Sequence, residues 1–141
     1  MIYIGIDPDV DKSGVAKYNT ETKKIEGIEL LSFFDLLDFL KYYRSTSVKV
    51  IIEGGHLNKV ANFHNRPGQT KKVGETIAKS VGRNHQTGIL IGEMCSYLDI
   101  DFEFCRPAEK KFSSSVFRMM TGIEVKNQEK IDAAMLVYGR K

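Results

Sequence analysis

The sequence contains 141 residues with a formal net charge of +3, and 42% of the residues are hydrophobic. This length suits one ordinary domain with a single core, so we expect a single domain over residues 1–141. A charged fraction of 28%, an aromatic fraction of 10% and the lack of a low-complexity tract are typical of a folded chain, and apolar stretches far shorter than ~20 residues argue against a membrane-spanning one.

The first segments alternate in the way that β-strands do. Isoleucines at positions 2, 4 and 6 precede Asp7 and Pro8, and two further β-forming runs follow at 13–18 and 25–31. Because Met1 leads directly into a strand-like segment, we expect no signal peptide. Cys95 and Cys105 show no CxxC spacing, which is typical of a reduced cytoplasmic protein.

Helices and strands alternate in the rest of the chain. Ser32 can cap a helix over 33–43, and the uninterrupted apolar run at 48–52 is typical of a buried central strand. Residues 54–68 lose all periodicity and predict a long irregular loop. The remaining expected elements are a long helix or two over 70–97, a strand over 101–105, a helix from Pro107 to about Met119, and a last helix from Asn127 to about Tyr138.

This order, βββαβαβαα, predicts an α/β fold. We expect a mixed five-stranded sheet, with three antiparallel strands followed by two parallel strands, flanked by helices. Gly74, Gly82, Gly88 and Gly92 lower the helix propensity of 70–97, so close packing on the sheet or room for a ligand backbone is needed to explain them.

Four acidic residues occupy positions that carry chemistry in such folds. Asp7 and Glu53 each follow a predicted strand, while Glu129 and Asp132 share one face of the last helix. If the first and fourth strands are parallel neighbours, all four carboxylates meet at one sheet edge, where their repulsion requires divalent cations. Oxygen ligands of this kind suit Mg²⁺ or Mn²⁺. Alternatively, Asp7 is a turn former and the helical pair is a solvated face.

A basic stretch lies between residues 54 and 85. It holds three histidines, His56, His64 and His85, whose spacing is too wide for a zinc motif, and a single acid, Glu75. The stretch would attract a polyanion, although a solvated helix face and loop would look the same in sequence. Its cations are Lys59, Arg66, Lys71, Lys72, Lys79 and Arg83.

Several short motifs resemble those of RuvC-type Holliday-junction resolvases, which belong to the RNase H-like superfamily. They are Ile4-Gly5-Ile6-Asp7-Pro8, Ser13-Gly14-Val15-Ala16, Val50-Ile51-Ile52-Glu53, Arg106-Pro107 with Lys110-Lys111, Thr121-Gly122, and Glu129-Lys130-Ile131-Asp132-Ala133-Ala134. The resemblance implies an RNase H-like fold and a metal-dependent endonuclease that resolves four-way or other branched DNA junctions. It also implies that Asp7, Glu53, Glu129 and Asp132 are the catalytic metal ligands, and that the protein is a homodimer without a small-molecule cofactor.

Two bound cations would allow in-line hydrolysis of a phosphodiester, leaving a 5′-phosphate and a 3′-hydroxyl. We expect phosphate contacts along the basic stretch, stacking by an aromatic residue, and help from the lysines after the fifth strand. The predicted DNA-contacting residues are Lys59, Phe63, Arg66, Lys71, Lys72, Lys79, Arg83, His85, Lys110 and Lys111.

Departures from the family pattern keep other readings open. Asp9 stands where the family usually has Gly, so Asp9 or Asp11 is a further candidate ligand; Glu129 stands where Asp is common. Phe63 replaces an aromatic residue that is missing after Glu53. The alternatives are a nuclease of this fold for RNA/DNA hybrids, a noncatalytic nucleic-acid-binding module, and a sugar-kinase or actin-like ATPase, which needs a second related domain.

Overall fold

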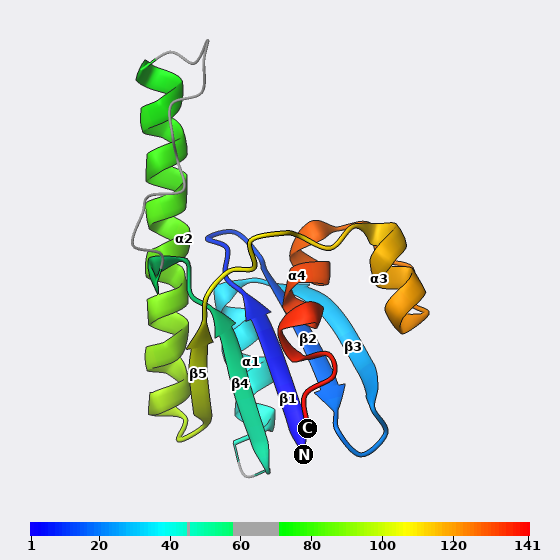
Figure 1. Cartoon of the computed structure of the whole chain (residues 1–141). Coiled ribbons are helices and arrows are strands. Elements are labelled where there is room, and N and C mark those ends of the chain that lie inside the picture. Colours follow the sequence, from blue (N-terminus) through cyan, green and yellow to red (C-terminus); the bar gives the residue numbers. More distant parts are fainter. Residues whose placement is uncertain (45, 58–70) are drawn as a thin grey trace.

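The computed structural model describes residues 1–44, 46–57 and 71–141. Within them, one mixed sheet has the strand order β3-β2-β1-β4-β5 (Figure 1). The first three strands are antiparallel, whereas β4 runs parallel to β1 and β5 parallel to β4. The predicted sheet, including the parallel pairing of the first and fourth strands, is confirmed. The strands are β1 (Ile2–Asp7), β2 (Ser13–Asn19), β3 (Lys24–Leu31), β4 (Val48–Glu53) and β5 (Asp101–Cys105).

The helices of the described residues begin near where the sequence predicts, with two exceptions: the third helix, and a short 3₁₀ helix inside the predicted loop 54–68. Residues 58–68 of that loop lie outside the described residues. Ser32 and Asn127 cap α1 and α4, their side chains accepting hydrogen bonds from the backbone N–H groups of Asp35 and Lys130. The helical elements are α1 (Phe33–Tyr42), the short 3₁₀ helix η1 (Gly55–Leu57), α2 (Lys71–Tyr97), α3 (Ser114–Thr121) and α4 (Gln128–Val137).

The predicted start of the third helix near Pro107 is wrong. α3 begins at Ser114, with Ser113 as its cap. The preceding segment follows β5 without helical structure, and the side-chain amide of Gln128 on α4 donates to the carbonyl oxygen of Phe112 at 3.0 Å. The hydroxyl of Ser113 accepts a hydrogen bond from the backbone N–H of Val116 at 3.2 Å, so a serine cap, and not Pro107, marks the start of the helix.

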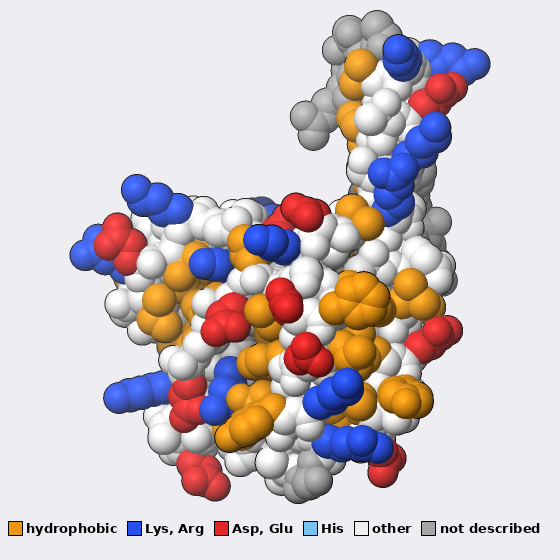
Figure 2. Space-filling model, turned by 180° about the vertical axis from the view of Figure 1, so that it is seen from behind, with side chains coloured by type: hydrophobic (Ala, Val, Ile, Leu, Met, Phe, Trp, Pro, Cys, Tyr) orange, Lys and Arg blue, Asp and Glu red, His pale blue; other side chains and the backbone are white. Residues whose placement is uncertain are grey.

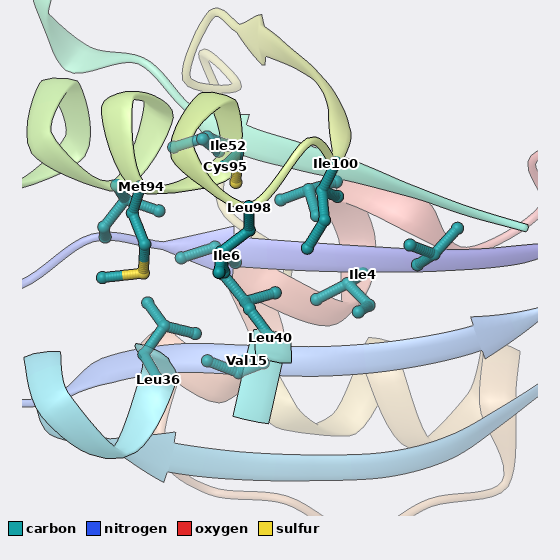
Figure 3. Close-up of a cluster of buried hydrophobic side chains, with 13 residues drawn as sticks. Ile4, Ile6, Val15, Leu36, Leu40, Ile52, Met94, Cys95, Leu98 and Ile100 are labelled. Carbon is teal, nitrogen blue, oxygen red and sulfur yellow. The ribbon is translucent and has the colours of Figure 1, made fainter. Parts of the chain in front are cut away.

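The sheet separates two hydrophobic clusters because successive side chains of a strand point to opposite faces. Ile4, Ile6 and Ile52 pack against α1 and the carboxyl-terminal half of α2 (Figure 3). Ile51 points to the other face and packs with residues of α3 and α4, including the fully buried Phe117. Side chains that alternate with Ile4 and Ile6 therefore belong to the α4 face.

Among the described residues, the carboxyl-terminal half of α2 packs against the sheet and the turn after β1. Gly88 lies against Pro8, and Gly92 lies so close to the ring of Phe104 that a β-carbon at position 92 would overlap it. Close packing thus explains both glycines, as the sequence suggests. The other half of α2 projects well beyond the sheet (Figure 1). None of the described helices is both long and apolar enough to cross a lipid bilayer.

Candidate metal centre

Strand alternation and strand pairing bring two acids together at one edge of the sheet. Asp7 ends β1 two residues after Gly5, which faces α4, and Glu53 ends β4 two residues after Ile51, which faces the same way. The parallel register pairs Ile6 with Ile52. Asp7 and Glu53 therefore emerge side by side on the α4 face, at the carboxyl ends of central strands.

Helix α4 approaches this face more closely than side chains normally allow. Gly5 lies directly against the backbone carbonyl of Ala133, and Gly14 lies against that of Glu129, so neither position has room for a β-carbon. Ala133 itself is fully buried. Because of this backbone-to-backbone contact, the helix lies close to the strand ends, and Asp132 lies beside the two strand-end acids.

The three carboxylates form one cluster. Among the described residues, Asp7, Glu53 and Asp132 each offer an oxygen, and these oxygens all lie within 4.8 Å of one another. Glu53 is only 9% exposed, and no described group donates a hydrogen bond to its buried Oε2. Burial, followed by the neighbouring Glu53 and Asp132, raises the pKa of Asp7 to about 9. The cluster is thus short of positive charge.

Lys111 supplies part of that charge. Its ammonium nitrogen lies 3.1 Å from Glu53 Oε1 and 2.9 Å from Asp132 Oδ2. Burial alone would lower the pKa of Lys111, but the hydrogen bonds to Asp132 and Glu53 raise it above its ordinary value. Asp132 also accepts a hydrogen bond from Gln128 at 2.7 Å, so both of its oxygens have donors.

Glu129, the fourth predicted acid, lies outside the three-carboxylate cluster and beside the turn that follows β1. Burial, then the charge of Asp9 and a side-chain hydrogen bond with it, raise the pKa of Glu129. The turn is well ordered by hydrogen bonds: Asp9 Oδ1 accepts from the backbone of Asp11 at 2.8 Å, and Asn84 of α2 accepts from Val10 at 3.0 Å. Asp9 and Glu129 therefore form a second pair of carboxylates next to the first cluster.

The donor set fits a divalent cation. Three carboxylates, one of them carrying a buried oxygen without a described donor, offer the hard ligands that Mg²⁺ and Mn²⁺ prefer. A cation bound between Asp7 and Glu53 would remove the repulsion that raises the pKa of Asp7. Asp9 and Glu129 interact with each other beside this cluster but do not belong to it.

The described part of the basic stretch leads toward this centre. Lys72, Lys79 and Arg83 are seven and four residues apart, so they share one side of α2, and all three are exposed. Figure 2 shows Lys and Arg side chains along the projecting part of the helix. One residue further on, Asn84 contacts the Asp9 turn.

Other predicted DNA-contacting residues have different surroundings. Lys71 lies 4.0 Å from Glu75 in a loose ion pair, and Lys110 is exposed. His85 lies against Gly55, where a β-carbon would touch its Nε2 at 2.5 Å. Lys59, Phe63 and Arg66 lie outside the described residues.

Two polar residues that the sequence analysis did not single out support the site. Gln128 holds Asp132, and its position four residues earlier on the same helix is a pattern that the sequence does contain. Asn84 reaches Asp9 across a separation of 75 residues, which no local pattern could reveal.

Comparison with known proteins gives no match in sequence: no family model and no curated protein matches the chain. Fourteen chains of solved structures do match it in fold, among them two of RuvC. RuvC of Thermus thermophilus in complex with a Holliday junction substrate is 15% identical, with a TM-score of 0.60, over 98% of this chain and 90% of that chain. Another Thermus thermophilus RuvC structure is 16% identical, with a TM-score of 0.55 and the same coverage. The chain has a RuvC-like fold.

This RuvC-like fold confirms the predicted RNase H-like architecture, and it extends over nearly all of the chain. Asp7, Glu53 and Asp132 belong to β1, β4 and α4, which are all part of the shared fold. Their convergence therefore follows from the architecture of the sheet and its covering helix.

Proposed function

We propose that this protein is a metal-dependent endonuclease that cuts branched DNA, such as a four-way Holliday junction. The observation that carries the proposal is the convergence of Asp7, Glu53 and Asp132 at the strand ends of a RuvC-like fold. A solved relative in fold was captured with a Holliday junction substrate, which supports branched DNA as the substrate class.

In this proposal, Asp7, Glu53 and Asp132 hold Mg²⁺, with Mn²⁺ as a substitute, and Glu129 is the fourth acid of the site. When bound, the metal supplies Lewis-acid activation of water and charge stabilisation at the leaving oxygen. Asp7 must give up its proton to act as a ligand, since its pKa of about 9 leaves it protonated at neutral pH. Gln128 fixes the orientation of Asp132 through its 2.7 Å hydrogen bond.

The cations around the cluster have separate tasks. Lys111 offsets carboxylate charge before the substrate binds and can donate to a phosphate oxygen that reaches the same space. Lys72, Lys79 and Arg83 bind phosphates along α2, which gives affinity without sequence specificity. The proposal also includes three DNA contacts that only the sequence supports, namely Lys59, Phe63 and Arg66.

We include a homodimer and a cytoplasmic location in the proposal. A four-way junction has two strands of like sense to cut, and a twofold dimer would present two equivalent sites to them. Residues 1–141 would act as one nuclease domain. Analytical ultracentrifugation of the free protein tests the dimer directly, because a monomer at micromolar concentration contradicts it.

Cleavage of labelled DNA tests the activity. Four-way junction, linear duplex and RNA/DNA hybrid are incubated with the wild-type protein in Mg²⁺ or Mn²⁺, and with Asp7→Asn in parallel. Asp38→Asn is the matched control, because it makes the same chemical change on an exposed position of α1, across the sheet from the site. We expect junction cleavage by the wild type and by Asp38→Asn only.

The other outcomes separate the alternatives. Cleavage of hybrids alone favours an RNase H-like nuclease for that substrate. Junction binding without cleavage in either metal favours a noncatalytic module, and equal cleavage by Asp7→Asn contradicts the proposed site.

A further inference from the structure

A pocket adjoins the three-carboxylate cluster and extends beyond it, and its remaining walls take no part in the metal chemistry proposed above. It measures about 300 Å³ and lies between the end of β5, helix α4 and the segment that leads to α3. Glu53, Lys111 and Asp132 form one end of it, so it opens onto the acids. The other walls are Cys105, Ala108, Phe112, Met135 and Leu136.

The register of β4 with β5 and the residue spacing on α4 place this pocket directly beside the acids. Cys105 is the register partner of Glu53 across the β4–β5 pairing, about 4.8 Å away along the sheet. Met135 follows Asp132 by three residues and lies on the same side of α4. Whatever occupies the pocket is therefore adjacent to a group held by Glu53 and Asp132.

The pocket combines an apolar interior with cations. Phe112 provides a ring, Met135 and Cys105 provide polarizable sulfur, and Arg106, Lys110 and Arg140 add positive charge. Arg140 is held in place, because its Nε donates to the carbonyl of Leu136 at 2.9 Å and its Nη1 to Glu103 at 3.0 Å. A fixed guanidinium and an aromatic ring are surfaces on which a nucleobase stacks.

We propose that this pocket receives one unstacked base of the DNA strand being cut, next to the phosphate at the acid cluster. This inference rests on the proposed function. A volume of about 300 Å³ lies at the lower end of the range for small-ligand pockets, which suits one base with its sugar. A nucleotide matches both the apolar walls and the cations of the pocket. Its flat base can contact the apolar walls, and its phosphates are attracted to the cations.

Such a pocket would also favour branched DNA over a linear duplex. Removing a base from an intact duplex costs a few kcal/mol of stacking and pairing, and the cost is least where the base is already unpaired. A branch point supplies such bases and a linear duplex does not. Occupancy of the pocket would thus select the branch before the phosphate reaches the acids.

An abasic scan tests the proposal. Junctions with one abasic site, at each position within two nucleotides of the cut, are compared with the intact junction in Mg²⁺ at saturating protein. In the wild type we expect one position at which losing the base lowers the cleavage rate about tenfold. Ala108→Trp fills the pocket from its exposed rim and should lose the same factor on intact DNA, with no further loss on the abasic junction. Thr22→Trp adds an indole ring at an exposed position of the turn between β2 and β3, away from the pocket, and should behave like the wild type.

The results distinguish this inference from the proposed function. Wild-type protein that cuts no junction at all refutes the nuclease. Wild-type protein that cuts, but whose rate is unchanged by every abasic site, or whose abasic sensitivity persists in full in Ala108→Trp, refutes the base pocket alone.

A second measurement does not depend on cleavage. Cys105 lines the pocket while Cys95 is fully buried in the core, so N-ethylmaleimide followed by mass spectrometry reports on Cys105, with Cys95 as the internal control. In Ca²⁺, intact junction should slow the modification of Cys105 several-fold. A junction that lacks the sensitive base should bind but protect much less; equal protection by the two junctions contradicts the proposal.

Discussion

Gly5 lies directly against the backbone carbonyl of Ala133, so that a β-carbon at position 5 would overlap the carbonyl oxygen. The contact joins the middle of β1 to the middle of α4. Because Asp7 is two residues beyond Gly5 and Asp132 is next to Ala133, this contact sets the distance between two of the three clustered acids.

Gly5→Ala should therefore damage both the fold and the site. The new methyl group meets backbone rather than a side chain that can move, so we expect a loss of about 3 kcal/mol in the free energy of unfolding. Stabilisation by Mg²⁺ should also disappear, because α4 must shift away from β1. Gly27→Ala on β3, where nothing lies within 4 Å, is the control and should leave both quantities unchanged in urea unfolding experiments.

The metal-free protein should lose stability as pH rises from about 4 to about 9. Folded Asp7 keeps its proton up to about pH 9, whereas an unperturbed aspartate loses it near 3.8, so in this range unfolding releases a proton and higher pH favours the unfolded chain. Urea unfolding in EDTA at pH 5, 7 and 9 measures the trend.

Asp7→Asn isolates the contribution of Asp7 to that trend. The variant cannot ionise, so it should be more stable than the wild type at pH 8, by ~2 kcal/mol, and the difference should shrink toward pH 5. Asp38→Asn should follow the wild type throughout. Parallel pH curves for wild type and Asp7→Asn would show that burial does not hold the proton on Asp7.

Lys111→Met should weaken the metal-free protein and enlarge its response to metal. Without the ammonium group, the carboxylates of Glu53 and Asp132 repel each other, but Lys111 is 46% exposed, so solvent limits the loss to about 1 kcal/mol. The lysine and a divalent cation compete for the same oxygens, so the rise in Tm on adding Mg²⁺ should be larger than in the wild type. The matched control is Lys110→Met, at an exposed position; a smaller rise in Lys111→Met than in this control argues against competition.

Neutralising the shared side of α2 should reduce DNA binding without affecting stability. The triple variant Lys72→Gln, Lys79→Gln, Arg83→Gln removes up to three phosphate contacts, each worth about 0.9 in the slope of log K against log salt concentration. Binding to a four-way junction in Ca²⁺ between 50 and 200 mM salt gives that slope. Lys23→Gln with Lys24→Gln, at the distant β2–β3 connection, should leave it unchanged.

Much of the fold could be predicted because the relevant signals are local. Alternating isoleucines predict β1, and an unbroken apolar run predicts β4. The acids at the ends of these two strands indicate a common site only if the strands are parallel neighbours, and they are. Ser32 and Asn127 are likewise local signals, because their residue types predict the N-caps of α1 and α4. The start of α3 was placed wrongly because Pro107 is compatible with a first helical turn, whereas the side chain that caps the helix is Ser113.

The candidate site was predicted less completely for a geometric reason. Glu129 and Asp132 share a face of α4, but three residues also separate them by about 4.5 Å along the helix axis. That offset brings Asp132 to Asp7 and Glu53 and leaves Glu129 beside Asp9. The pocket beside Cys105 is assembled from three elements, so no single stretch of sequence shows it.

Helix α2 can be viewed as a rigid arm fixed at one end. Its residues 71–87 extend about 25 Å at the rise of an α-helix, and the arm is seated where Gly88 and Gly92 touch Pro8 and Phe104. Near this contact, Asn84 forms hydrogen bonds with the turn that contains Asp9. If DNA binds along this arm as proposed, the contact of Asn84 with the turn would couple the position of the bound duplex to the position of Asp9, so that DNA binding and the alignment of the acids would depend on each other.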